Sequence, residues 1–262
     1  MGASARIGLL GALLASLAAL AGPVGPVLAS ERVTLHASFS PDRPGVSTTI
    51  GFGFEIHDSN GLPPTPLRSV SLHLPPGIGY LTTTLGLATC EPAALIAHGL
   101  AGCSPNSRLG FGSAFVEVPF GSSRGYEIPE IQALMGPPHD GNIVVLFYAN
   151  GREPVYAQIV FEGELITGSP TLGGRLDAVV PLIPSVPDGP AVSIVRVHTT
   201  IGPSHLTYYE QVHGKTVSFH PRGVTVPVHC PRGGFRFSAR FGFQDGSDTV
   251  ARTSVPCPRR HR

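Results

Sequence analysis

The chain of 262 residues has no tryptophan, and aromatic residues make up only 7% of it. Sugar-binding sites commonly stack the ligand on aromatic rings, so a carbohydrate-binding surface here would depend on tyrosines such as Tyr208 and Tyr209. An excess of charge is also missing, because the formal net charge is +1. The sequence therefore carries no electrostatic footprint for nucleic acid or for an anionic membrane.

Long uninterrupted segments are scarce as well. The 27 prolines and 33 glycines are spread along the chain and leave little room for long helices. Such a density of breakers predicts short strands that are joined by turns.

The first 29 residues have the layout of a secretory signal peptide. Arg6 precedes an apolar run over 7–21, and small residues at 27 and 29 suit cleavage before Ser30. The run is near 15 residues, shorter than the roughly 20 of a membrane-spanning helix. We therefore expect a mature region, 30–262, that is secreted or held at the cell surface, with no transmembrane segment. Without Arg6, the 18 basic residues fall to the number of acidic ones, 17.

Apolar and polar residues alternate in several stretches. In "VTLHASF" (33–39) the valine, leucine, alanine and phenylalanine share one face, and 50–57 and 70–74 follow the same rule. This period of two is typical of a strand with one buried and one solvated face. The segment 142–149 is apolar on both faces, and a turn at 150–154 leads into 155–166, which predicts an antiparallel hairpin.

Further strands are predicted from 191, 215, 234 and 248 onward. Many short strands without alternating helices predict an all-β fold, an antiparallel β-sandwich of the immunoglobulin-like or a related type. The proline-rich stretch 180–190 is either a seam between two units or a long crossover within one sandwich. One short helix is expected near 91–98, where Glu91 and Pro92 suit a first turn and Gly99 suits the end.

Four cysteines in an exported chain indicate two disulfides, for which three pairings exist. Proximity favours Cys90 with Cys103, around the short helix, and Cys230 with Cys257, at the base of the last hairpin. In the chain-entropy picture each bridge stabilises the fold by roughly 3–4 kcal/mol. No pair has the short spacing of a zinc site, and the even number argues against a catalytic thiol.

Two patterns invite a hydrolase. "GSSRG" (121–125) matches G-x-S-x-G, which would make Ser123 an esterase-like nucleophile, but no helical period follows, and a hairpin loop explains the motif better. Glu162 and Glu164 share a strand face at about 7 Å, within the range of glycosidase carboxylates. That face also carries Tyr156, Gln158 and Val160, an ordinary half-exposed mixture.

Several histidines and aspartates are candidates for metal binding. His36, His57 and His73 would share the solvated faces of neighbouring strands, and 205, 213, 220 and 229 are also histidines. None has the sequence spacing of a metal motif, so solvated or hydrogen-bonded roles are favoured. Asp245 and Asp248 are a candidate calcium corner, but a plain turn explains them better. We predict no catalytic, cofactor or metal residue.

The stretch "SLHLPPGIG" (71–79), then Cys90, then "CSPNSRLGFGSAFVEV" (103–118) resembles secreted, β-rich proteins of soil actinobacteria. In that group a strand ends in Leu-Pro-Pro-Gly, two cysteines bracket a short helix, and a Cys-x-Pro-x-Ser-x-x-Gly run leads into the next strand. The ending 226–258 is also similar to their terminal strands. The resemblance covers about half of the mature chain and implies export, disulfides and β architecture, with no established activity.

Together these features favour an exported, non-enzymatic protein that acts as a cell-envelope or extracellular interaction module. Its partner is an unknown extracellular or cell-surface molecule, and no cofactor is implied. The alternatives are a secreted hydrolase, esterase-like or glycosidase-like, and a carbohydrate-binding module.

We expect the leader to be removed on export. The mass of the protein recovered from the medium or the cell surface should correspond to a chain that begins at Ser30. Replacing two leucines of the apolar run by arginine should keep the protein inside the cell, because the run must be apolar to engage the export machinery. Export that is unaffected by these substitutions would contradict the assignment.

Overall fold

The computed structural model describes residues 31–78, 84–154, 156–168 and 173–257, and the predicted signal peptide lies outside them. The predicted all-β class is confirmed. The strands are β1 (Glu31–Ser40), β2 (Ser47–Asp58), β3 (Leu67–His73), β4 (Arg108–Phe120), β5 (Ser123–Glu127), β6 (Glu130–Met135), β7 (Ile143–Gly151), β8 (Ala157–Ile166), β9 (Arg175–Val179), β10 (Ser193–Ile201), β11 (Tyr208–Val212), β12 (Lys215–Phe219), β13 (Val224–Thr225), β14 (Phe235–Phe243) and β15 (Asp248–Val255). The helices are α1 (Pro92–His98) and the 3-10 turns η1 (Gly99–Gly102) and η2 (Pro105–Ser107).

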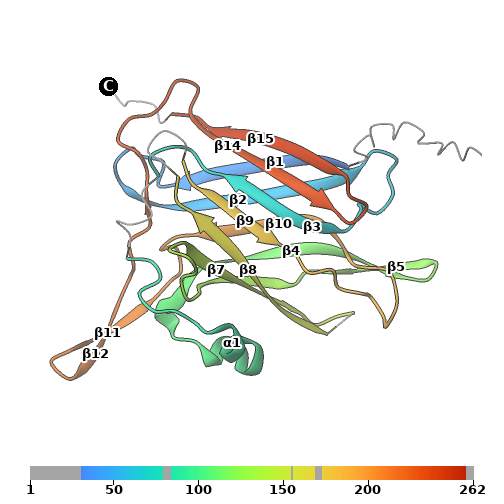
Figure 1. The fold of residues 1–262 in the computed structure, drawn as a ribbon. Helices are drawn as coiled ribbons and strands as arrows, with labels where there is room; N and C mark the ends of the chain where they lie inside the picture. Colours follow the sequence, from blue (N-terminus) through green and yellow to red (C-terminus); the bar gives the residue numbers. More distant parts are fainter. Residues whose placement is uncertain (1–30, 79–83, 155, 169–172, 258–262) are drawn as a thin grey trace, which may run out of the picture.

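One antiparallel sheet dominates the molecule. Its strands follow the order β1-β2-β10-β4-β6-β7-β8-β9-β3-β14-β15, with β13 beside β2 and β5 beside β4. The two ends of this path come together, since the Thr249 hydroxyl on β15 donates to the Glu31 carbonyl on β1 over 2.9 Å. The sheet is thus nearly closed into a barrel, as Figure 1 shows, and β11 and β12 form a separate hairpin.

The sandwich arrangement predicted from the sequence is not confirmed, because a single hydrogen-bonded path joins eleven strands. Strand alternation requires only that one face of each strand be buried, and a curved sheet satisfies that as well as two facing sheets do. The stretch 180–190 connects β9 to β10 within the same sheet.

Alternation decides which side chains enter the barrel. On β1, Leu35 and Phe39 are buried while Thr34 and His36 are exposed. Inside, Phe54 of β2 meets Phe241 of β14 with ring centroids 4.9 Å apart. Edge-to-face aromatic contacts of this kind add to burial, so β1 and β2 are held against β14 across the interior.

The end of the barrel that carries the β1–β2 turn is filled by loops. Ile78, Leu85, Leu206, Tyr208 and Val226 are all buried there and join the main hydrophobic core. The backbone amide of Gly45 in the turn donates to the Val226 carbonyl over 3.0 Å. This end is therefore closed, and the β11–β12 hairpin projects beyond it in Figure 1.

The short helix is present at the predicted place. Leu95 of α1 is fully buried against the outer face of β6 and β7, in a cluster with Leu134, Leu146 and Tyr148. Gly99 ends the helix with a φ of +57°, a value that favours glycine. None of the described helices is long and apolar enough to cross a membrane.

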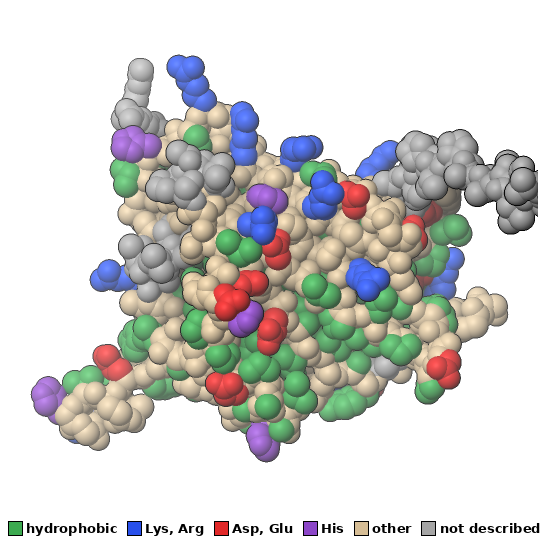
Figure 2. All heavy atoms as spheres, in the orientation of Figure 1, with side chains coloured by type: hydrophobic (Ala, Val, Ile, Leu, Met, Phe, Trp, Pro, Cys, Tyr) green, Lys and Arg blue, Asp and Glu red, His purple; other side chains and the backbone are tan. Residues whose placement is uncertain are grey.

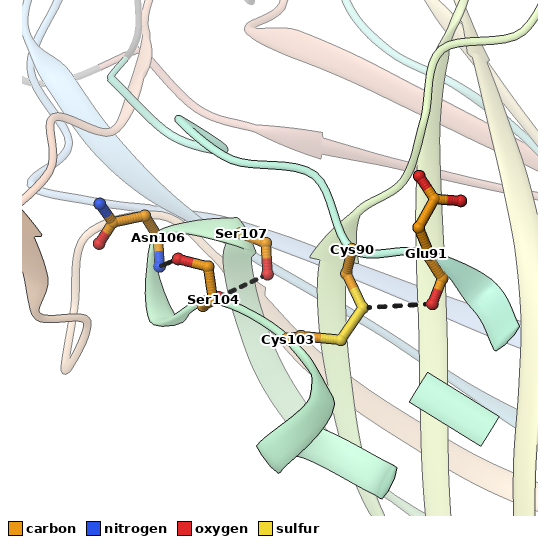
Figure 3. Close-up of a disulfide and its surroundings, with 6 residues drawn as sticks. All are labelled: Cys90, Glu91, Cys103, Ser104, Asn106 and Ser107. Carbon is orange, nitrogen blue, oxygen red and sulfur yellow. Dashed lines mark hydrogen bonds between the residues drawn. A yellow bond between two sulfur atoms is a disulfide. The ribbon is translucent and has the colours of Figure 1, made fainter. Parts of the chain in front are cut away.

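Both disulfides join the cysteines that are nearest in sequence. Cys90 and Cys103 (Cα–Cα 5.2 Å) bracket α1, as Figure 3 shows, and the Cys90 amide donates to the Met135 carbonyl over 2.8 Å. Cys230 and Cys257 (Cα–Cα 5.8 Å) close the base of the β14–β15 hairpin. The first bridge fixes the helix to the barrel wall, and the second ties down the last strand.

We expect Phe241→Ala to lower the free energy of unfolding by about 3–5 kcal/mol, because this fully buried ring would leave a void in the core. Urea unfolding followed by circular dichroism measures the change. Tyr209→Ala, at an aromatic side chain that is 45% exposed on β11, is the matched control and should change it by less than about 0.5 kcal/mol. Equal effects of the two substitutions would contradict the proposed core.

Candidate functional site

A cavity of about 330 Å³ lies inside the barrel. Side chains from β2, β3, β4 and from β6 to β10 form its wall, together with Phe237 of β14. Only two polar side chains, Thr199 and Glu127, occur among the described residues that line it. The Thr199 hydroxyl donates to the Phe52 carbonyl over 3.2 Å, so its hydrogen-bonding capacity is used within the wall.

The apolar wall follows from strand alternation. On β7, every second residue from Ile143 to Gly151 faces the cavity, and on β8 the residues in register with them do the same. Phe147 and Phe161 stack at 5.1 Å between ring centroids on this wall. The neighbouring residues of both strands face outward, which explains why 142–149 is apolar on both faces: α1 covers the outside and the cavity lies inside.

One end of the cavity is formed by Glu127, Pro129, Gly151, Ala157 and Ile183, and we call this end the mouth. The strand register brings these residues together, because Glu130 pairs with Asn150 on β7 and Gly151 pairs with Ala157 on β8. The mouth is opposite the closed end, on the side toward which β5 extends in Figure 1.

The wall is interrupted beside the mouth. β8 pairs with β9 only from Gly163 to Ile166, so among the described strands 157–162 has a partner on one side, β7, and a free edge on the other. Beyond β9 the chain leaves the sheet at Pro181 and returns at Ser193. A free edge of this kind exposes unpaired backbone groups, which sheets normally cover or shorten.

Large apolar side chains are exposed around the mouth. Ile128 is 66% exposed and Tyr156 is 72% exposed, and Tyr126 and Val186 also face solvent. Figure 2 shows hydrophobic side chains gathered over the lower half of this view, where β7 and β8 lie in Figure 1. Contiguous apolar patches that are exposed on a protein surface often mark sites of interaction.

Among the described residues that line the cavity, Glu127 has the one charged side chain. It is 9% exposed, and its Oε1 atom has no hydrogen-bond partner. Among the described residues no basic side chain lies within ion-pairing distance of it. Glu117 is also buried and its Oε1 also lacks a hydrogen-bond partner, but its charge is compensated because this oxygen lies 3.1 Å from Arg124 Nη1. A buried carboxylate without a donor is unfavourable and needs an explanation.

A second hollow, of about 460 Å³, lies outside the barrel between α1 and the outer face of β6, β7 and β8. Gln132, Tyr148, Asn150 and Arg152 line it. Burial raises the pKa of the Tyr148 hydroxyl, the Tyr156 ring adds to this, and Arg152 opposes it. Tyr148 is therefore protonated at neutral pH, and the hollow contains hydrogen-bonding groups together with the charged side chains of Arg152 and Glu130.

The structure does not assemble an esterase-like elbow around Ser123. This serine is exposed and opens β5 in a tight hairpin, paired with Phe120 of β4. A strand follows it where the hydrolase motif requires a helix that aims its amino end at the oxyanion. The hairpin explanation of "GSSRG" is confirmed.

The predicted carboxylate pair lies on the outer face of β8. Glu164 accepts a hydrogen bond from Asn142 Nδ2 over 2.7 Å and lies 3.9 Å from His139, while Glu162 pairs across to Leu146. Asp245 accepts hydrogen bonds from the amide (2.9 Å) and hydroxyl (2.7 Å) of Ser247, and these bonds lower its pKa. These contacts are those of a closed turn.

The histidines are dispersed over the outer surface. His36 and His57 are exposed on β1 and β2, His73 is exposed on β3, and His57 lies 3.6 Å from Glu55. In the part of the chain that the structure describes, no three His, Cys, Asp or Glu side chains are arranged to hold a metal ion. Tyr208, one of the two tyrosines considered for sugar stacking, is fully buried.

Tyr208 instead belongs to the main hydrophobic core, at the end of the barrel opposite the mouth. Its hydroxyl donates to the Arg108 carbonyl and accepts from the Gly86 amide over 3.0 Å. Burial raises the pKa of this hydroxyl. The side chain thus bridges the 84–90 segment and β4, and both backbone groups depend on it.

Comparison of the chain with protein-family models, with curated proteins and with solved structures finds no match. The resemblance to secreted actinobacterial proteins therefore stays a prediction. The assignment of a function depends on the geometry of the cavity and its mouth.

We expect Tyr208→Phe to destabilise the protein by about 1–3 kcal/mol, because Arg108 and Gly86 lose their partner in a buried place. The wild-type hydroxyl has a folded-state pKa above its unfolded value of 10.0, so its linkage lowers stability as pH rises above 10. Urea unfolding at neutral and alkaline pH, with tyrosinate absorbance, measures both effects. The variant should show a smaller alkaline loss; an equal loss would contradict the assignment.

Proposed function

We propose that the chain is an exported, non-enzymatic binding module that holds an apolar ligand inside its barrel, at or beyond the cell surface. The observation that carries the proposal is the cavity, which is lined almost entirely by hydrocarbon side chains. Sites for small molecules are concave, mostly apolar and fitted with few polar groups, and this cavity has each of those properties.

The size of the cavity limits the ligand. Its 330 Å³ is near the lower end of ligand pockets, which span about 300–1,000 Å³. Since an apolar cavity of about 150 Å³ accepts benzene, this one accommodates roughly a dozen carbon atoms. A single medium-length hydrocarbon chain or a small fused-ring molecule is therefore the class of ligand that fits.

The wall favours an apolar guest over water. Water needs two to four polar partners in a cavity, and apart from Glu127 this wall offers none that are unused. Displacing disordered water from such walls, or filling a dry void, gains contacts on every side. The exposed apolar side chains at the mouth, Ile128 and Tyr156 among them, supply a surface over which such a guest can enter.

The features that favour export support the same role. Two disulfides suit an oxidising compartment, and the leader-like segment 1–29 has the composition of a signal peptide. An apolar molecule outside the cell needs a container because its own solubility is low. The hydrolase and sugar-binding alternatives gain no corresponding support, since Ser123 and Glu162 lie apart from the cavity.

We expect the mature protein, residues 30–262, to bind the small fused-ring fluorescent probe 1-naphthylamine, which is uncharged at neutral pH, saturably and with one site. The chain has no tryptophan, so probe emission is measured against a low background. Ala149→Phe, on the cavity face of β7, should weaken binding at least about tenfold because the added ring fills the space.

The matched control is Thr34→Phe, at an exposed position on the outer face of β1. It adds a similar ring to the surface and should leave probe affinity unchanged. Circular dichroism establishes that both variants keep the β fold. Absence of saturable binding to the wild type, or unchanged affinity in a folded Ala149→Phe, would overturn the proposal.

A further inference from the structure

Glu127 sits where the β5–β6 connection crosses the mouth of the cavity. It pairs with Val116 of β4, and directly opposed residues in an antiparallel pair lie on the same face of the sheet. Val116 lines the cavity, so the Glu127 side chain points to the interior, in agreement with its place in the wall. Its neighbour Tyr126 belongs to the opposite face, where it pairs with Glu117.

The two buried glutamates of this hairpin therefore have different roles. Glu117 faces outward and pairs with Arg124, which compensates its charge. The Oε1 atom of each glutamate lacks a hydrogen-bond partner, but Glu127 faces an apolar cavity, and among the described residues no basic side chain lies within ion-pairing distance of it. Since a buried charge without a partner is unfavourable, a ligand group that donates to the Glu127 carboxylate from the cavity would gain both a hydrogen bond and the removal of that penalty.

The Glu127 carboxylate packs against Gly151, and it fits there because this residue has no side chain. A Cβ atom at this position would lie 2.5 Å from Glu127 Oε1, so any larger residue would push the carboxylate aside. Gly151 is the last residue of β7 and has a backbone conformation that other residues adopt. The requirement for glycine here is thus one of space at the carboxylate.

We propose that Glu127 recognises the polar head of the ligand, and that the ligand is a single-chain amphiphile with a hydrogen-bond-donating head, an ammonium group in preference to a hydroxyl. The inference rests on the proposed function, because the hydrocarbon tail would occupy the apolar interior toward Phe147 and Phe161. The carboxylate at the mouth then accepts from the head. A charge-assisted bond of N–H to carboxylate is stronger than a neutral one, and an anionic head would be repelled.

This assignment accounts for the whole gradient of polarity along the cavity. Within the described wall, the closed end is apolar, Phe147 and Phe161 lie in the middle, and the one charged side chain is at the mouth. An amphiphile that enters tail first meets complementary surface at each step. A purely apolar guest would leave Glu127 without a partner.

The test is competition of four twelve-carbon ligands against 1-naphthylamine at neutral pH, with the two ionic ligands below their micelle concentrations and the two uncharged ligands below their solubility limits. Dodecylamine should compete most strongly, then dodecanol, then dodecane, with dodecanoate weakest. We expect dodecylamine to bind about tenfold or more tightly than dodecanoate, a ratio that corresponds to about 1.4 kcal/mol.

Glu127→Gln keeps the shape of the side chain and removes the charge, and should reduce the amine-to-carboxylate ratio to within about twofold. Glu117→Gln is the matched control: it removes the other buried carboxylate of the same hairpin, on the outer face, and should leave the ratio as in the wild type. Gly151→Ala provides a second arm, because it displaces the carboxylate while keeping the charge, and should also lower the ratio.

The outcomes separate the two proposals. If the probe does not bind saturably, the proposed function fails and the head-group assignment fails with it. If the probe and dodecane bind but the heads do not differ, or dodecanoate is preferred, only the role of Glu127 is overturned. A preference for dodecylamine that survives both Glu127→Gln and Gly151→Ala also overturns that role.

Discussion

The architecture depends on one constraint: successive side chains of a strand point to opposite faces, and one face must be kept from water. In a sheet whose ends meet, that face becomes the inside of a container. Leu35 on β1, Phe54 on β2 and Phe241 on β14 fill one part of it by direct contact. The strands β6 to β10 keep the same alternation, but their inward side chains do not fill the space in front of them. The space that remains is the cavity.

The cavity is consistent with how the barrel is closed. Loops with Leu206, Tyr208 and Val226 seal one end, while the other end has the free edge of β8 and exposed apolar side chains. The two ends of the interior therefore differ, because one is sealed and the other is less covered. The two disulfides tie surface elements to the barrel. Cys90–Cys103 holds α1 over β7, and Cys230–Cys257 fixes the last hairpin.

Much of the local structure could be predicted from the sequence. The alternation at 33–39, the two-sided apolar run at 142–149 and the helix ended by Gly99 each depend on neighbours within a few residues, and each appears in the structure. β6 and β9 were not identified because both are short and adjoin proline or glycine. The choice between sandwich and barrel could not be made, since it depends on which distant strands pair, as β9 does with β3.

Likewise, neither the cavity nor the position of Glu127 in its wall could be predicted from sequence patterns. Glu127 resembles any polar residue beside a turn, and its significance comes from its partner Val116 and from Gly151 two strands away. The sequence signal can be recognised once the fold is known. Side chains alternate from Gly125 through Tyr126 to Glu127, and this alternation places Glu127 on the inner face. The motifs that drew attention, "GSSRG" and the Glu162 pair, are local in sequence and lie on the outer surface.

The contact between β1 and β15 determines where the two ends of the described chain lie. Glu31 lies beside Thr249, and Ser40 lies toward the turn that contacts Val226, so the two edge strands run in the same direction. The described chain therefore starts on the side of the mouth and finishes, at Cys257, on the sealed side. A protein anchored to a solid support by its carboxyl end would present its opening outward, whereas a fusion joined ahead of Glu31 would crowd the entrance.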